Sequence, residues 1–103
     1  MPNANYLKGR RNEYELMKAL EERGYVVMRT SGSHGPFDVI GINPKNGHIQ
    51  FIQAKVTEDD ATAKRLLAAF KEDPPIPPFV LPPGVAQVMS VKVTRKGRRQ
   101  VVV

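Results

Sequence analysis

The chain contains no cysteine among its 103 residues. Disulfide bonds, thiolate metal ligands and cysteine nucleophiles are therefore excluded, as is usual in a reducing intracellular environment. No apolar run approaches the roughly 18 residues that span a bilayer, and the start of the chain lacks the apolar centre of a secretion signal. We expect an intracellular protein that is neither exported nor inserted into a membrane.

Aromatic residues make up only 7% of the chain, which argues against a stacking platform for single-stranded nucleic acid. Acidic residues are also outnumbered, because 16 lysines and arginines stand against 10 aspartates and glutamates, a net charge of +6. This excess favours a polyanionic partner, and DNA or RNA is the first candidate, although a protein can be basic without one. The length allows one hydrophobic core, so we expect residues 1–103 to form a single domain.

Apolar residues at helical spacing predict a helix over residues 10–23, ended by Gly24. Its inner stripe is expected to contain Leu16, Met17, Ala19 and Leu20. Glu13 falls within this stripe, where a carboxylate without a partner would be costly. Two interpretations stay open for Glu13: a boundary residue paired with a nearby cation, or a metal-site carboxylate that faces the sheet.

Strands are predicted over residues 25–28, 39–42 and 48–55, and an Asn-Gly turn makes the last two antiparallel. Side chains alternate along a strand, so Gln53 and Lys55 share a face, and Asp38 at the start of the preceding strand is expected near them. Mg²⁺ prefers oxygen ligands, and an adjacent lysine can orient water or neutralise charge on a phosphate. The pattern predicts a metal-dependent site for phosphate chemistry.

The loop over residues 29–36 is rich in glycine and hydroxyl groups. Arg29 is a candidate phosphate ligand because a guanidinium can bind phosphate through two hydrogen bonds. Ser31 and Ser33 can also bind phosphate, although such loops are commonly plain connectors. His34 is a weaker candidate proton donor, since a single loop histidine is more often solvated.

The second half predicts a helix capped by Thr57 and Asp60, with Ala63, Leu66, Leu67 and Phe70 inward and Pro74 at its end. Residues 73–84 hold six of the nine prolines and predict an extended, stiff connector. Exposed Ile76, Phe79 and Leu81 in this segment could alternatively form a partner contact. Residues 85–103 are expected to form a terminal β-hairpin.

Basic residues gather near both ends of the chain. Lys8, Arg10 and Arg11 lie near the start, and Arg95, Lys96, Arg98 and Arg99 lie in the terminal hairpin. We expect both groups to contact DNA phosphates independently of sequence, which predicts binding that weakens steeply with salt. The alternative is a solvated basic hairpin.

Several pieces together resemble the archaeal Holliday junction resolvases of the PD-(D/E)XK nuclease superfamily, over about residues 8–60. They are, in order, Lys8-Gly9, Glu13, Glu15-Leu16, residues 24–29, Ser31-Gly32-Ser33, Asp38 and Lys55-Val56-Thr57. The resemblance implies an α/β fold with a restriction-endonuclease-like core, in which two helices flank a mixed sheet of four or five strands. It further implies homodimers that cut four-way DNA junctions with Mg²⁺ or Mn²⁺.

The resemblance also implies roles for individual residues. Glu13 and Asp38 would hold the metal, Lys55 would be the catalytic lysine, and Arg29 with the hydroxyl of Ser31 or Ser33 would contact the scissile phosphate. The chain departs from the family at Gln53, where the family has a glutamate, and at Tyr14, where a basic residue is common. The segment after residue 70 is also shorter and richer in proline.

Gln53 can offer a carbonyl oxygen to a metal but carries no charge, so we expect weaker metal binding. Three functions stay open. The first is a metal-dependent endodeoxyribonuclease for branched DNA, above all Holliday junctions, with Glu13, Asp38, Gln53 and Lys55 in its site. The second is a nuclease for flaps, nicks or foreign DNA that uses the same core, and the third is a DNA-binding accessory protein that has lost cleavage.

Overall fold

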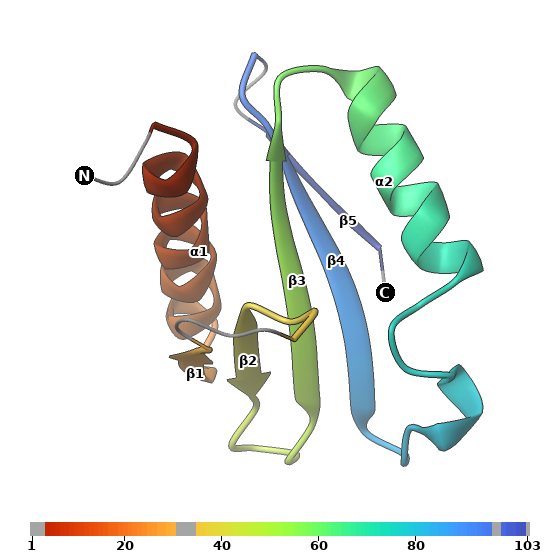
Figure 1. Cartoon of the computed structure of the whole chain (residues 1–103). Coiled ribbons are helices and arrows are strands. Elements are labelled where there is room, and N and C mark those ends of the chain that lie inside the picture. The colour runs from red at the N-terminus through yellow and green to blue at the C-terminus, as the bar shows by residue number, and fades with distance from the viewer. Residues whose placement is uncertain (1–3, 31–34, 96–97, 103) are drawn as a thin grey trace.

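The computed structural model describes residues 4–30, 35–95 and 98–102, with side chains for residues 9–30 and 35–95. The elements are α1 (Ala4–Glu22), β1 (Val26–Arg29), β2 (Val39–Ile42), β3 (Ile49–Thr57), α2 (Asp60–Glu72), a 3₁₀ turn η1 (Pro78–Val80), β4 (Val85–Val93) and β5 (Arg98–Val102). Five strands form one sheet in chain order (Figure 1). Neighbouring strands are antiparallel except β3 and β4, which are parallel. The predicted α/β class with a mixed sheet is confirmed.

Helix α1 begins at Ala4, earlier than the predicted start at residue 10, and continues through Gly9. Its inward face contains Asn12, Leu16 and Leu20, each one turn from the next, and all three are buried. Ala19 is exposed, so its predicted place in the stripe is wrong. It precedes Leu20 by one residue and therefore lies about 100° around the helix from it.

Gly24 ends α1 as predicted. Its φ of +89° is a left-handed conformation that glycine adopts without strain. The N–H of Gly24 donates to the carbonyl of Glu21 at 2.9 Å, and that of Tyr25 donates to Leu20 at 3.0 Å, which is the Schellman pattern. Tyr25 then packs against the core beside Leu20, so the chain turns directly into β1.

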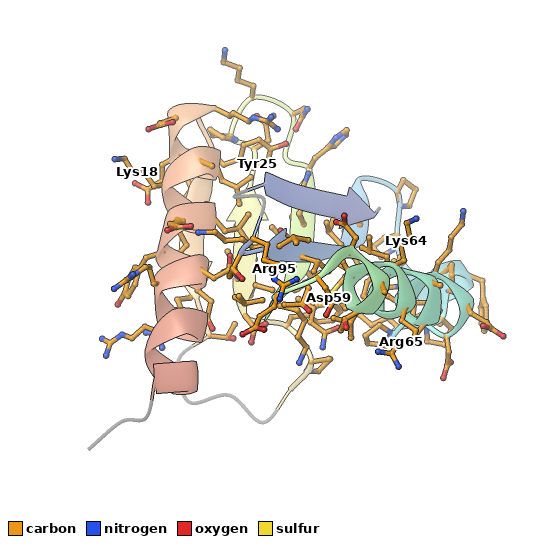
Figure 2. The ribbon with its side chains drawn as sticks, turned by 90° about the horizontal axis from the view of Figure 1, so that it is seen from above. Lys18, Tyr25, Asp59, Lys64, Arg65 and Arg95 are labelled. Atoms are coloured by element: carbon orange, nitrogen blue, oxygen red, sulfur yellow. The ribbon has the colours of Figure 1, made fainter. Side chains whose placement is uncertain are left out.

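The two helices cover opposite faces of the sheet. Leu16 and Leu20 of α1 pack with Val39, Ile52 and Val88, whereas Ala63 and Phe70 of α2 pack with Met89, Val91 and Val93. Val88 and Met89 are neighbours in β4, and neighbours in a strand point to opposite faces. Figure 2 shows the two helices apart, with strands between them. Neither helix, as far as the structure describes it, could cross a membrane.

Helix α2 is capped by Asp59 and not by Thr57. The N–H of Thr62 donates to Oδ1 of Asp59 at 2.7 Å, and this bond holds the pKa of Asp59 below its ordinary value. Arg95 lies beside Asp59 in Figure 2 and lowers this pKa further. Thr57 is unsuited to the cap because it ends β3, where its carbonyl accepts a hydrogen bond from the N–H of Thr94.

The proline-rich segment is only partly the extended connector that its composition predicts. It includes the turn η1, and the side chain of Gln87 in β4 holds it to the sheet. The Gln87 amide accepts from the N–H of Ile76 at 3.0 Å and donates to its carbonyl at 2.6 Å. Of the three apolar residues expected to be exposed, only Phe79 is fully so, at 89%, because Ile76 and Leu81 are half-buried.

Replacing Gln87 with leucine is expected to lower the free energy of unfolding by about 2 kcal/mol. The backbone N–H and the backbone carbonyl of Ile76 would both lose the side chain to which they are hydrogen-bonded. Gln87 itself is only 7% exposed, so water cannot easily substitute. Denaturant unfolding followed by circular dichroism measures the change. Gln50→Leu is the matched control, since no described hydrogen bond involves the Gln50 side chain, and equal stabilities of the two variants would contradict the prediction.

Candidate active site

Asp38 comes directly before β2 and is held against β3. Its N–H donates to the carbonyl of Ile52 at 2.8 Å, although the strand register pairs Ile52 with Val39. Two successive residues therefore meet one residue of the partner strand, the pattern of a β-bulge, which re-aims side chains. The carboxylate of Asp38 lies over β3, where its Oδ2 accepts from the N–H of Ala54 at 2.8 Å.

Gln53 and Lys55 flank Ala54 in β3 and share one face, as predicted. This is the α2 face, because Gln53 and Lys55 pair in register with Met89 and Val91, which pack against α2. Gln53 is half-buried and Lys55 is exposed. Both line a cavity of about 210 Å³ that Asp73 also borders. The bond from Ala54 thus places the Asp38 carboxylate at the β3 backbone between Gln53 and Lys55, the two residues that the sequence singled out.

Glu13 on α1 forms an ion pair with Arg29 at the end of β1. Nε of Arg29 donates to Oε1 of Glu13 at 2.8 Å, and the two side chains are only 18% and 19% exposed. The carboxylate raises the pKa of Arg29 above its ordinary value, chiefly through this hydrogen bond. The pairing that one interpretation of Glu13 required is therefore present, and it leaves the metal-site interpretation open.

Arg29 links the ion pair to Asp38. It is the register partner of Val39, and the N–H of Thr30 donates to the carbonyl of Asp38 at 3.0 Å. Glu13 and Arg29 nevertheless lie on the α1 face, whereas Gln53 and Lys55 lie on the α2 face. Pairing between β2 and β3 ends at Val39 and Ile52, so Gln53 directly follows the last paired residue of β3. The structure thus brings Asp38 to the β3 backbone between Gln53 and Lys55, whereas Glu13 is paired with Arg29 on the other face of the sheet.

A divalent cation suits the chemistry of these side chains. Two carboxylates and an amide supply only oxygen donors, which Mg²⁺ and Mn²⁺ prefer, and such ions keep several waters. Each carboxylate has one oxygen engaged, Oδ2 in Asp38 and Oε1 in Glu13, and no described hydrogen bond reaches the other oxygen. The described side chains contain no group of three acidic, histidine or cysteine ligands. Of the two carboxylates and the amide, Asp38 and Glu13 are the side chains that carry a charge.

Asn12 was missed by the sequence interpretation. It is 2% exposed, and its Nδ2 lies 3.4 Å from the carbonyl of Lys55. It therefore connects α1 to the strand that carries the lysine. The signal was a polar residue four positions before Leu16 in the buried stripe, a place where an amide needs a partner.

The proposed DNA contacts are described only in part. Arg10, Arg11 and Arg95 are exposed, and Arg29 is half-buried in its ion pair. Ser31, Ser33, His34 and Lys96 lie outside the described residues, as do the side chains of Lys8, Arg98 and Arg99. For all of these residues, described or not, contact with DNA stays a prediction.

Comparison with known proteins assigns the chain to a family. The family model for the archaeal Holliday junction resolvase (Hjc) matches residues 4–65, from the start of α1 into α2. The solved Hjc structure from Archaeoglobus fulgidus is similar in fold, with a TM-score of 0.58 and 21% identity over 91% of this chain and 70% of that one. No curated protein matches significantly. Since the family model covers more than half of the chain, including every proposed catalytic residue, the chain belongs to the archaeal Holliday junction resolvase family.

Proposed function

We propose that the chain is a metal-dependent endodeoxyribonuclease that cuts branched DNA, above all four-way junctions. The single observation that carries this proposal is the hydrogen bond from the backbone N–H of Ala54, the residue between Gln53 and Lys55, to the carboxylate of Asp38. A carboxylate can hold a cation beside a phosphate, and a lysine on the adjoining strand can handle a proton near that phosphate. Membership of the resolvase family supports the choice of substrate.

In this proposal Asp38 and Glu13 would hold Mg²⁺ or Mn²⁺, and the carbonyl oxygen of Gln53 would be a weak third ligand or would orient a water. Such a cation would supply a water of lowered pKa and would stabilise the leaving oxygen. The ammonium of Lys55 orients the attacking water and offsets negative charge on the phosphate. Arg29 keeps further N–H groups besides the one bonded to Glu13, because a guanidinium has five, and these can bind the phosphate.

A second candidate function follows from Gln53. A neutral amide in place of an acid lowers the charge available to a cation, so the chain could bind branched DNA as an accessory protein without cutting it. A nuclease for flaps, nicks or foreign DNA is the third candidate and requires the same residues. These candidates differ in which DNA is cut and in whether any DNA is cut.

Cleavage of matched DNA substrates separates the candidates. A labelled four-way junction, a flap, a nicked duplex and an intact duplex of the same sequence are incubated with the protein in Mg²⁺, in Mn²⁺ and in chelator. We expect cutting of the junction in either metal and none in chelator. Tight junction binding without cutting in any metal would favour the accessory function, and cutting of flaps or nicks alone would favour the third candidate.

We also propose that the chain acts as a homodimer. Resolving a junction requires two symmetric cuts, and one chain carries one copy of Asp38, Gln53 and Lys55. Sedimentation equilibrium with and without junction DNA measures the assembly. A monomer that cuts both strands in one binding event would contradict this proposal.

A further inference from the structure

Tyr14 lies between two arginines on the outer side of the Glu13 ion pair. The guanidinium carbon of Arg10 is 5.7 Å from the centre of its ring, and that of Arg29 is 5.4 Å from it. Arg10 also lies 3.5 Å from the Tyr14 hydroxyl, through one terminal nitrogen. Arg10 and Tyr14 are one helical turn apart on α1, whereas Arg29 comes from β1, so the fold and not the local sequence completes the group.

Both contacts fall within the distance at which an aromatic ring attracts a cation. The hydrogen bond and positive charge of Arg10, with a smaller contribution from Arg29, lower the pKa of the Tyr14 hydroxyl. Tyr14 is 48% exposed although it is a large aromatic residue. Its ring therefore does little for the core, and it contacts two cations, the exposed Arg10 and the half-buried Arg29.

We propose that Tyr14 is a positioning residue that holds Arg10 and Arg29 as a pair of cations directed at neighbouring phosphates of the DNA substrate. Each guanidinium carbon is less than 6 Å from one ring centre, so the two can be no more than about 11 Å apart. Repulsion between them is offset by the ring and by Glu13. A polyanion gains from meeting two cations already held in place, because less side-chain entropy is lost on binding.

The arrangement gives Arg29 a second support. Glu13 accepts a hydrogen bond from Nε of Arg29, but a metal ion bound by Glu13 would compete with Arg29 for that carboxylate. The Tyr14 ring would then still hold the Arg29 guanidinium near the site. Arg10, one turn earlier on α1, also places a positive charge beside position 14, where this chain has an uncharged tyrosine instead of a basic residue. This inference rests on the proposed function, since it assumes that DNA binds at the Glu13 and Asp38 end of the sheet.

The test compares Tyr14→Ala, Tyr14→Phe and Arg10→Gln in the full chain, using fluorescence anisotropy with a labelled four-way junction over a series of salt concentrations. We expect Tyr14→Ala and Arg10→Gln each to weaken junction binding roughly five- to tenfold. Each should also reduce the salt slope, the slope of log affinity against log salt concentration, by the amount that corresponds to about one phosphate contact. Tyr14→Phe keeps the ring and should stay within about threefold of wild type. The double variant Arg10→Gln/Tyr14→Ala should be little weaker than the singles, because the two residues act together.

Lys64→Gln is the matched control, because it also removes one exposed cation from a helix but lies on α2 (Figure 2). An unchanged salt slope in Tyr14→Ala, with its fold intact by circular dichroism, would overturn the inference. If wild type binds no DNA at all, the proposed function fails, and this inference fails with it.

Discussion

Replacing Asp38 with asparagine is expected to lower junction cleavage by a factor on the order of a hundred or more, while DNA affinity stays within about threefold. The amide oxygen of asparagine can still accept the hydrogen bond from the N–H of Ala54, so the join between β2 and β3 should survive. What disappears is the negative charge that would hold the cation. Single-turnover cleavage and anisotropy binding, measured on one preparation, separate the two effects.

Asp73→Asn is the matched control for Asp38→Asn. Asp73 borders the same cavity as Gln53 and Lys55 but contacts neither β2 nor the Ala54 amide through a described hydrogen bond. We expect this variant to cut junctions at nearly the wild-type rate. Full cleavage by Asp38→Asn, or its loss in Asp73→Asn, would show that the metal site has been assigned to the wrong carboxylate.

Replacing Gln53 with glutamate is expected to raise the affinity for Mg²⁺ or Mn²⁺ roughly tenfold, because a second charged oxygen donor would lie beside Asp38. Cleavage at limiting metal should rise accordingly. Calorimetric titration of the protein with Mn²⁺ alone measures the affinity without relying on activity. If wild type proves to be a binding protein without cleavage, gain of cutting in this variant would show that Gln53 is the residue that silences it.

Gln50→Glu provides the control for added charge. Gln50 lies in the same strand, but an odd number of residues from Gln53, so its side chain belongs to the opposite face. The Gln50→Glu variant should leave the affinity for Mg²⁺ or Mn²⁺ unchanged. Equal effects of the two variants, or no effect of Gln53→Glu, would argue that position 53 contributes no metal ligand.

The sequence was sufficient for most of the fold because its signals are local. Strand β2 was predicted with its observed bounds, and the Asn-Gly turn predicted its antiparallel pairing with β3. Gly24 was predicted as the end of α1 because a left-handed residue is needed there. The first residues of the helices were harder to predict. Thr57 has the chemistry of a cap, but strand pairing with β4 holds it in the sheet, and Asp59 caps α2 instead.

The candidate site was predicted as residue types and was arranged by tertiary contacts. Alternation along a strand is a local property, so the shared face of Gln53 and Lys55 followed from the sequence alone. The partner of Glu13 did not, because Arg29 comes from another element, and neither did the second cation on the Tyr14 ring.

The sequence by itself therefore determined the mixed α/β fold, the family and the residues of the candidate site. Only the tertiary structure decided that Asp38 bonds the amide between Gln53 and Lys55, that Glu13 is paired, and that Asn12 is buried against β3. The physical reason is that periodicity and turn chemistry act between neighbours in the chain. Hydrogen bonds between α1, β1, β2 and β3 depend instead on how these elements pack around Leu16, Val39 and Ile52.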